Sequence, residues 1–304
     1  MAHPQDGVLL LDKPAGFSST QALARSKRLL GAGKAGHTGT LDPFATGLLP
    51  LVFGEATKFA RFLIDAPKSY RATLELGVET TTGDTEGVPT AKRPVAVDES
   101  MIDEVLGTFT GFLDQVPPMH SAIRVRGKRL YELAREGVEV ERAARRIEIQ
   151  ELERISLEGE KLVISVTCSK GTYVRALAVE LGRALGCGAY LTALRRTVAG
   201  PFRIEQAATL EELERDGVEG ARARLLCVEV LVTGLPRWDA AADAALRFTQ
   251  GQVLDCPPAA RGDEFAVFGP GGRLLGVGRC GSPGRIAPVR LMATGDSPKL
   301  PDFA

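Results

Sequence analysis

The chain has 304 residues, of which 44% are hydrophobic and 25% are charged. This composition is that of an ordinary globular protein with one large core or two smaller ones, and it excludes a disordered chain, a collagen and a coiled coil. The 38 Lys and Arg residues balance the 38 Asp and Glu residues, so the total charge indicates neither a nucleic acid nor a membrane as a partner.

The first predicted elements are a strand, a helix and a second strand. Residues 8–11 form a strand-like apolar run, and residues 18–21 have the S-x-x-Q form of a capping box, which predicts a helix over residues 22–30. Strict alternation over residues 69–76 then predicts a half-buried strand with Tyr70 on its apolar face.

The middle of the chain continues with both kinds of element. Apolar residues at helical spacing predict a helix over residues 99–109, and alternation over residues 162–166 predicts another strand. An amphipathic helix is predicted over residues 174–185, and Thr209 is expected to open a further helix.

The C-terminal part differs in composition from the rest of the chain. From about residue 234, Gly and Pro become frequent, and the apolar runs are short, as over residues 265–268, 274–277 and 286–292. Short strands separated by Gly and Pro turns predict a small β-rich domain. We therefore expect one domain over residues 1–234 and a second over residues 235–304.

Neither a membrane segment nor a metal site is predicted. The apolar run at residues 8–11 is far shorter than the roughly 18 residues that span a bilayer or the core of a signal peptide, so we expect a cytoplasmic protein. The five cysteines lie tens of residues apart without a C-x-x-C motif, and the chain has three histidines. This spacing favours free thiols over a disulfide framework or a zinc site.

The balanced total charge is the sum of segments that carry net charges of opposite sign. Residues 117–150 hold 8 basic and 5 acidic side chains, whereas residues 61–116 hold 5 basic and 10 acidic ones. The pattern predicts one basic arm and one acidic flank.

Asp42 has an unusual charge environment. It is the only acid between Lys13 and Gly54, a stretch with five cations. Nearby opposite charge lowers the pKa of a carboxyl group, so we expect Asp42 to be ionised, and an ionised Asp in a loop rich in Gly, Thr and Pro is a candidate nucleophile. The alternative is that Asp42 caps the turn before Pro43.

Two further groups of cations stand out. Arg124, Arg126, Lys128 and Arg129 put four positive charges into six residues, which can bind phosphates or form a solvated surface loop. Lys170 and Arg175 lie on either side of Tyr173 at a turn between a predicted strand and a predicted helix, where they can line a site or be structural.

These features occur within motifs that resemble the TruB-type tRNA pseudouridine synthases. The resemblance covers about residues 7–205 in order, with a weaker likeness from Phe268 to Met292. Its motifs are GVLLLDKPAGFSST (7–20), GHTGTLDPFATGLLP (36–50), KSY (68–70), TGDTEG (82–87), PPMHSA (117–122), CSKGTYVR (168–175) and LRR (194–196). The block around Asp42 is the most specific of these motifs.

The resemblance implies a fold and a reaction. Family members convert uridine 55 in the T loop of tRNA to pseudouridine without a cofactor or a metal, and they flip the target base out of its stack. The implied fold is α+β, the pseudouridine synthase fold with a mixed and mostly antiparallel sheet flanked by helices, and it carries an RNA-binding arm at about residues 117–146. The C-terminal region resembles a short, diverged PUA-type domain that contacts the acceptor stem.

The resemblance also implies roles for individual residues. Asp42 matches the catalytic aspartate, Arg175 the arginine that pairs with it, and Tyr70 the tyrosine that stacks on the base and assists removal of the C5 proton. Attack on the ribose C1′, attack on the uracil C6 and elimination through a glycal are all open for such an aspartate. Substrate-binding roles are implied for four further residues, His37, which inserts into the RNA, Tyr173, Leu194 and, in support, Lys13.

The arm departs from the family pattern at two positions. His120 and Arg124 replace the usual aromatic residue and lysine, which puts the detailed contacts of the arm in doubt but leaves the chemistry intact. We expect a monomer that needs no protein partner and turns its acidic flank away from the RNA. The competing functions are a non-catalytic tRNA-binding or folding factor and a pseudouridine synthase that depends on a guide RNA.

Overall fold

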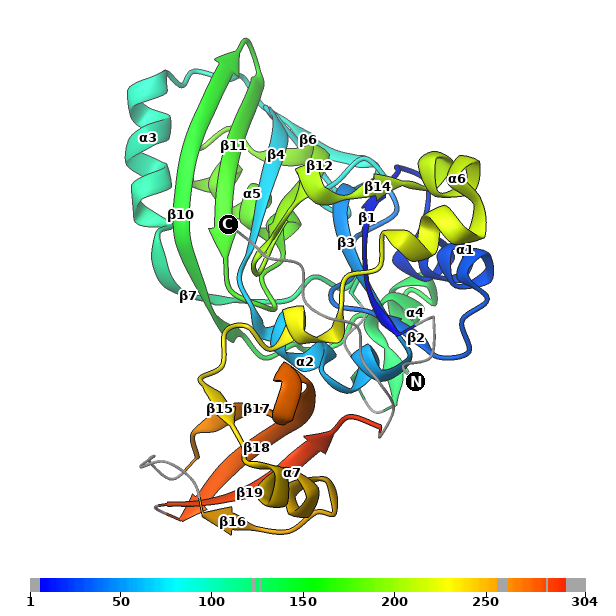
Figure 1. Ribbon diagram of the computed structural model, residues 1–304. Coiled ribbons are helices and arrows are strands. Elements are labelled where there is room, and N and C mark those ends of the chain that lie inside the picture. The colour runs from blue at the N-terminus through cyan, green and yellow to red at the C-terminus, as the bar shows by residue number, and fades with distance from the viewer. Residues whose placement is uncertain (1–5, 122–123, 126, 256–261, 283, 294–304) are drawn as a thin grey trace.

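The computed structural model describes residues 6–121, 124–125, 127–255, 262–282 and 284–293. A large sheet and its helices form the upper part of the molecule in Figure 1, and a smaller sheet lies below it. The helices are α1 (Ser19–Leu30), α2 (Ala60–Asp65), α3 (Glu99–Thr108), α4 (Leu130–Arg135), α5 (Val174–Ala184), α6 (Leu210–Ala223) and α7 (Ala242–Thr249).

The large sheet has ten strands and is mixed. Its main path consists of β14 (Ala208–Thr209), β1 (Gly7–Lys13), β3 (Thr46–Phe53), β12 (Ala189–Ala199), β4 (Lys68–Leu76), β11 (Lys161–Cys168), β10 (Arg145–Glu158) and β7 (Gly111–Gln115). Off this path, β2 (Ala35–His37) pairs with β3, and β13 (Phe202–Arg203) pairs with β12. Within the described part of this sheet, only the pairs β1–β14 and β3–β12 are parallel, so the predicted mostly antiparallel sheet is confirmed.

The central strands of this sheet are buried on both faces. Leu9 and Leu11 of β1 join the core beneath α1, α3, α5 and α6, whereas Val8 and Leu10 join a second core on the opposite face. A strand that is covered on both sides reads as a continuous apolar run, as residues 8–11 do. On strands of this kind, polar site residues are therefore expected where a strand ends, or where a charged side chain is buried together with hydrogen-bond partners.

The predicted regular elements are found where periodicity was clear. The helix after residue 18 begins with the expected capping box, in which the Ser18 hydroxyl accepts from the Gln21 amide and the Gln21 side chain accepts from the Ser18 amide. Alternation in β4 buries Ala72, Leu74 and Leu76 and exposes Arg71, as expected. Helix α7 lies in a region for which only strands were predicted.

The arm is an insertion between two neighbouring strands. Strands β7 and β10 pair antiparallel at the edge of the sheet, with Arg145 opposite Gln115. The chain between them contains β8 (Arg124–Val125), β9 (Lys128–Arg129) and α4, and β8 and β9 form a short hairpin. A separate small hairpin is made by β5 (Val78–Thr80) and β6 (Pro89–Lys92).

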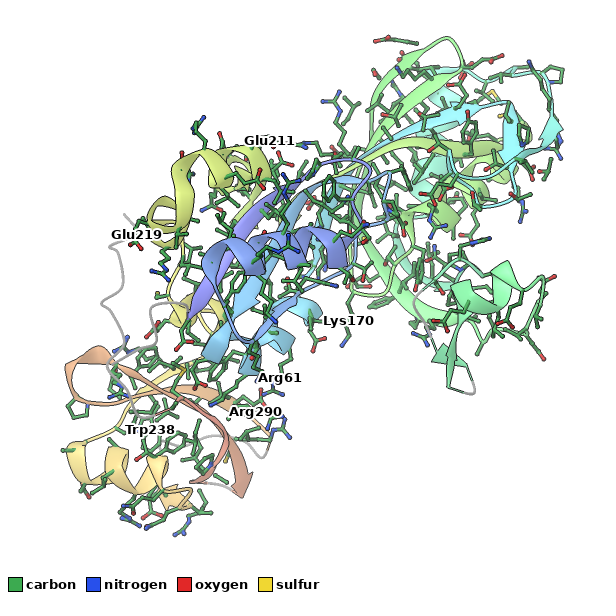
Figure 2. All side chains as sticks on the ribbon, turned by 90° about the vertical axis from the view of Figure 1, so that its right-hand side faces the viewer. Arg61, Lys170, Glu211, Glu219, Trp238 and Arg290 are labelled. Carbon is green, nitrogen blue, oxygen red and sulfur yellow. The ribbon has the colours of Figure 1, made fainter. Side chains whose placement is uncertain are left out.

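The C-terminal region is β-rich, as predicted. Its five-stranded sheet runs in the order β15 (Arg237–Asp239), β17 (Glu264–Phe268), β18 (Leu274–Ser282), β19 (Arg285–Leu291) and β16 (Leu254–Asp255). Phe268, Leu274 and Met292 pack in one core with Phe59 and Leu63, which belong to the segment around α2. Arg61 of α2 lies at this junction and forms an ion pair with Glu264 at 2.7 Å (Figure 2).

Candidate active site

Asp42 lies in the loop between β2 and β3. The Ala45 amide donates to the Asp42 main-chain oxygen at 3.1 Å, so the main chain closes the turn, and the Asp42 carboxylate serves another partner. Gly47 ends the loop with a φ of +101°, and a Cβ there would lie 2.3 Å from the Arg196 main-chain oxygen. Only glycine fits such a close approach, which holds the loop against β12.

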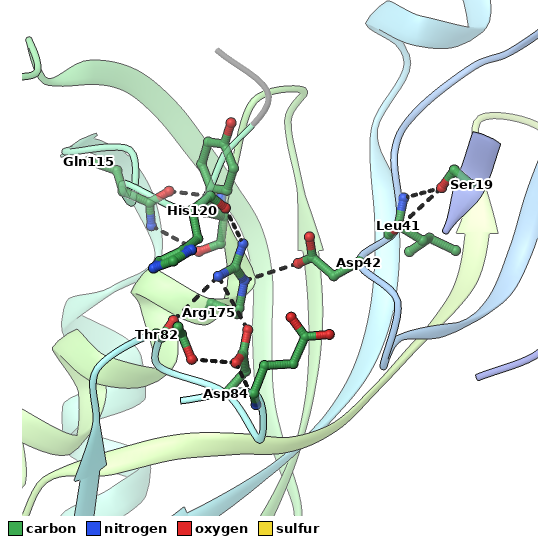
Figure 3. A network of polar contacts seen from close by, with 10 residues as sticks. Ser19, Leu41, Asp42, Thr82, Asp84, Gln115, His120 and Arg175 are labelled. Atoms are coloured by element: carbon green, nitrogen blue, oxygen red, sulfur yellow. Dashed lines mark hydrogen bonds and ion pairs between the residues drawn. The ribbon is translucent and has the colours of Figure 1, made fainter. Parts of the chain in front are cut away.

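Arg175 is the partner of Asp42. It lies in the first turn of α5, is 4% exposed, and donates from Nε to the Asp42 carboxylate at 3.0 Å (Figure 3). Its Nη1 lies 3.2 Å from the Asp84 carboxylate and donates to the Thr82 carbonyl at 3.3 Å, and its Nη2 donates to the His120 carbonyl at 2.7 Å. One guanidinium thus connects the Asp42 loop, the segment before β6 and the arm.

The pKa of Asp42 differs from the prediction made from the local charge count. Burial raises the pKa of this carboxyl group above its usual value, and the nearby Asp84 carboxylate raises it further, although Arg175 and Lys13 act in the opposite direction. The expected lowering of the pKa by a surrounding set of cations is therefore wrong. Arg25, one of those cations, instead forms an ion pair with Glu214 of α6.

Lys13 holds the main chain of the same loop by hydrogen bonds. Its side chain is fully buried, and its ammonium group donates to the main-chain oxygens of Pro14 at 2.9 Å, Phe17 at 2.7 Å and Pro43 at 3.4 Å. Burial lowers the pKa of Lys13 to about 8, while the Asp42 carboxylate acts to raise it. The Lys13 side chain is thus placed to hold the residue that follows Asp42.

Tyr70 and Leu194 lie on adjacent strands, β4 and β12. Tyr70 is half-buried opposite Arg196, Leu194 is nearly buried opposite Ala72, and the register puts these side chains on one face of the sheet. Burial raises the pKa of the Tyr70 phenol, and the Asp42 carboxylate raises it further. The two predicted pocket residues are therefore close to each other, and Tyr70 lies within electrostatic range of Asp42.

Tyr173 is fixed by the end of β7. The Gln115 side chain accepts from the Tyr173 amide at 2.8 Å and donates to the Tyr173 carbonyl at 3.2 Å (Figure 3). Burial raises the pKa of the Tyr173 phenol. Tyr173 thus lies where α5, β7 and the arm meet.

His37 is the last residue of β2 and is half-buried. Its Nδ1 is enclosed without a hydrogen-bond partner among the described residues. Burial lowers the pKa of the His37 imidazole, and the positive charge of Arg196 lowers it further. A neutral imidazole with an unused ring nitrogen is suited to contact with an uncharged base.

The arm carries the remaining predicted residues. The His120 carbonyl accepts from Arg175, which ties the start of the arm to the Asp42 network. Arg124, Lys128 and Arg129 lie in the β8–β9 hairpin, with Arg124 opposite Arg129, and their side chains are not among those described. Arg126 lies outside the described residues.

Asp84 and Gln115 are site residues that were not predicted. Both are buried, and they bind Arg175 and the main chain of Tyr173, respectively. The TGDTEG motif at residues 82–87 could have pointed to Asp84, because an acid in a Gly- and Thr-rich loop is the same signal that singled out Asp42. No sequence pattern marked Gln115.

The described residues contain no group of three His, Cys, Asp or Glu side chains that could hold a metal ion. None of the helices within the described ranges is long and apolar enough to cross a membrane.

Three family models match successive parts of the chain. The TruB family pseudouridylate synthase (N terminal domain) matches residues 27–174, the tRNA pseudouridylate synthase B C-terminal domain matches residues 175–233, and the pseudouridine synthase II TruB, C-terminal model matches residues 240–292.

Relatives with curated names and solved structures agree with these models. The chain is 53% identical over 289 residues to a tRNA pseudouridine synthase B from Aromatoleum aromaticum, with 95% of this chain and 93% of that protein covered. It is 48% identical to the protein of the same name from Dechloromonas aromatica, with 96% and 97% covered. Among solved structures, a Cbf5-Nop10-Gar1 complex contains a chain with a TM-score of 0.75 and 29% identity, with 95% of this chain and 85% of that chain covered. The order of the strands, the Asp42 loop and the extent of these matches lead to one conclusion, that the chain belongs to the TruB family of pseudouridylate synthases.

Proposed function

We propose that the chain isomerises uridine 55 in the T loop of tRNA to pseudouridine with Asp42 as its nucleophile and without a cofactor. The observation that carries this proposal is the Asp42 carboxylate, whose side chain is 35% exposed and is held by the buried Arg175 at 3.0 Å. In the isomerisation the bond between N1 and C1′ breaks, a bond between C5 and C1′ forms, C5 loses a proton and N1 gains one. The reaction is balanced without an oxidant or a reductant.

The surrounding residues support particular steps. Tyr70, on the strand beside Leu194, stacks on the flipped base and assists removal of the C5 proton, because an aromatic ring is suited to a flat base. Tyr173 and Leu194 line the uridine pocket, and Lys13 supports the Asp42 loop. Asp42 attacks C1′ or C6, or acts through a glycal, since each route begins at the same carboxylate.

Base flipping and RNA binding belong to other parts of the molecule. Unstacking the target base costs a few kcal/mol, and His37 inserts into the space that the base leaves. The arm, through His120, Arg124, Arg126, Lys128 and Arg129, binds the T stem-loop, with phosphate contacts from its four cations.

The domain division and the setting follow from the same proposal. The catalytic domain comprises residues 1–234 with the arm at 117–146, and a PUA-like domain comprises residues 235–304 and contacts the acceptor stem. The β-rich sheet that begins at β15 supports this boundary. We propose a monomer in the cytoplasm that acts without an obligate protein partner.

The identities favour a tRNA substrate over a guide-RNA assembly. The relatives named tRNA pseudouridine synthase B are about 50% identical to the chain, whereas a chain in the H/ACA RNP bound to a substrate RNA is 27% identical. A factor that only folds tRNA does not need the carboxylate of Asp42 next to Tyr70 and Arg175. The isomerase proposal accounts for all three side chains.

The decisive experiment uses the full chain alone with an unmodified T stem-loop RNA, and product is measured as pseudouridine by mass spectrometry. Wild-type protein should form pseudouridine at position 55, whereas Asp42→Asn and Asp42→Ala should bind the RNA and lose on the order of 10³-fold or more of kcat, because the nucleophile is removed. Asp243→Asn, which alters an exposed acid of α7, is the matched control and should keep wild-type activity.

Three results would contradict the proposal. Product from either Asp42 variant at the wild-type rate would exclude Asp42 as the nucleophile. RNA binding without product in the wild type would favour the folding factor. Activity that appears only after a guide RNA or partner proteins are added would favour the guide-dependent alternative.

A further inference from the structure

Arg196 is a buried cation at the centre of the large sheet. It lies on β12 between the two strands that flank the site, directly opposite Tyr70 of β4 and Gly47 of β3. Only 1% of Arg196 is exposed, and its side chain is the largest that is fully buried among the described residues. A guanidinium in such a position needs a physical reason, because burying a charge is costly.

The hydrogen bonds of Arg196 go to the segment that carries the nucleophile. Its Nε donates to the Leu48 main-chain oxygen at 2.6 Å, and its Nη2 donates to the Gly39 main-chain oxygen at 3.2 Å. Gly39 and Leu48 lie on either side of Asp42, so one side chain holds both ends of the Asp42 loop. A Cβ on Gly39 would lie 3.3 Å from Nη1, which shows how closely the loop approaches the guanidinium.

The same guanidinium reaches the other side of the site. It lies opposite Tyr70 in the register of β12 and β4, its positive charge lowers the pKa of the Tyr70 phenol, and the same charge acts on Lys13, Lys68, His37 and Cys168. None of the ion pairs found between described residues includes Arg196, and its acceptors are main-chain oxygens. Since carbonyl oxygens rather than a carboxylate stabilise this cation, its position depends on the conformation of the loop, and the conformation of the loop depends on the cation.

We propose that Arg196 is a positioning residue that fixes the loop carrying His37 and Asp42 against the strand carrying Tyr70. This inference rests on the proposed function, because the loop and the strand carry the nucleophile and the base-stacking ring. Arg196 does not touch the reacting atoms. It sets the distance between the groups that do, and effective catalysis needs such groups to be held in a reactive geometry.

The side chain suits this task better than a lysine does. A guanidinium has five N–H donors in a planar fork, so it can bind the main-chain oxygens of Leu48 and Gly39 from two different nitrogens, whereas a single ammonium nitrogen cannot match both directions. Arg196→Lys therefore keeps the positive charge and loses part of the anchoring, and Arg196→Gln loses the charge as well. The two variants separate charge from geometry.

The first readout is kinetic. For Arg196→Lys we expect kcat per folded molecule to fall about 10-fold or more, with KM for the tRNA changed less than about threefold, because the loop and Tyr70 are misplaced while the cations of the arm, which carry the proposed phosphate contacts, are unchanged. Folded protein is measured by circular dichroism. The control is Arg195→Gln, the neighbouring residue on β12 that binds Asp12 at 2.6 Å on the other face, which should keep kcat within about twofold.

The second readout does not require activity. The chain has three histidines, so the imidazole proton resonance of His37 can be assigned by comparison with His37→Gln and titrated by NMR. Because the charge of Arg196 disfavours the imidazolium form, the pKa of His37 should rise in Arg196→Gln and stay near the wild-type value in Arg196→Lys and Arg195→Gln. A residue that only stabilised the fold would lower the melting temperature without these differences.

Wild-type kcat per folded molecule in Arg196→Lys would overturn the proposal, and so would an unchanged pKa of His37 in Arg196→Gln. If Arg196→Gln does not fold, the kinetic result with Arg196→Lys decides alone. If wild-type protein forms no pseudouridine, the proposed function fails, and the titration of His37 still tests whether Arg196 holds its loop.

Discussion

At the scale of single residues, the site contains two carboxylates that share one arginine. Arg175 lies 3.0 Å from the carboxylate of Asp42 and 3.2 Å from that of Asp84. Asp42 is partly exposed, whereas Asp84 is 2% exposed and is held by the Thr82 hydroxyl and the Glu86 amide. The buried Asp84 carboxylate thus raises the pKa of the partly exposed Asp42 carboxyl group.

Removal of the Asp84 charge should change the pH dependence of the reaction. The Asp84 carboxylate raises the pKa of Asp42, so Asp84→Asn should lower that pKa and leave Arg175 to Asp42. Since Asp42 acts in its ionised form, the acid limb of kcat/KM should move to lower pH. The profile of pseudouridine formation against pH measures this shift.

Glu86→Gln, a change of an exposed acid in the same loop, is the control and should leave the acid limb in place. An acid limb in Asp84→Asn that coincides with that of the wild type would show that Asp84 does not act on the nucleophile.

The site could be predicted in part because its motifs are contiguous. Asp42 was marked by a loop whose composition excludes a regular element, and Arg175 by its turn between a strand and a helix. The electrostatic partner of Asp42 could not be predicted from its neighbours in the sequence, because Arg175 is 133 positions away from Asp42. The nearby Arg25 pairs with Glu214 instead, so closeness along the sequence was a poor guide to closeness in space.

At the scale of elements, the arm and α5 are linked at the site. The His120 carbonyl at the start of the arm accepts a hydrogen bond from Arg175 at 2.7 Å. The arm leaves β7 at Gln115, which also holds Tyr173. An RNA that displaces the arm therefore acts on the residues beside the nucleophile.

The cations of the arm should dominate the salt dependence of RNA binding. Changing Arg124, Arg126, Lys128 and Arg129 together to Ala should weaken tRNA affinity and flatten the slope of log Kd against log salt, since each lost phosphate contact lowers the slope by about one. Filter binding at several salt concentrations measures this slope.

An equal number of exposed arginines elsewhere provides the control, with Ala at Arg28, Arg183, Arg203 and Arg215. We expect a smaller change in slope for this set. The same slope in the arm variant as in the wild type would mean that the arm is a solvated loop.

Elements with regular periodicity were predictable, and those shaped by the site were not. Alternation identified β4, and helical spacing identified α5. Strand β12 escaped because it has irregular pairing at two places and carries two consecutive arginines, of which Arg196 is buried. A charged residue in a core position reads as surface in a sequence, so the pattern fails where tertiary contacts override it.

At the scale of the whole molecule, the two sheets share a core. Leu274 and Phe268 of the C-terminal sheet pack in one cluster with Phe59, Leu63 and one face of the large sheet. The ion pairs of Glu264 with Arg61 and Arg279 lie beside this cluster. A shared core of this kind makes the smaller sheet part of one cooperative unit.

The full chain should therefore unfold in a single thermal transition. Leu274→Ala, which creates a cavity in the shared core, should lower stability by about 2–5 kcal/mol and move the whole transition to lower temperature. Differential scanning calorimetry measures both effects. Leu246→Ala, at an exposed position of α7, is the control and should change stability by less than about 0.5 kcal/mol.

Two separate transitions in the wild type, with Leu274→Ala affecting one of them, would contradict a shared core.

The net charge of zero also has a different meaning for the folded molecule. Acids of the segment 61–116 are neutralised by neighbouring elements, as in the pairs of Arg154 with Glu99 and Asp103 and of Lys170 with Asp65. The predicted acidic flank is thus in part a set of ion pairs. In the proposed function, the charges that contact RNA are those of the arm and of the Asp42 loop, and the total charge of the chain does not reveal them.

The network of Arg175 is made by residues of the chain itself. Its guanidinium is buried and bound to Asp42, Asp84 and two main-chain oxygens. A preorganised environment of this kind needs no dipole to reorient when charge develops during the reaction. In the proposed reaction, folding of the chain therefore sets the position of the Asp42 carboxylate, and the free energy of tRNA binding is available to unstack the target base.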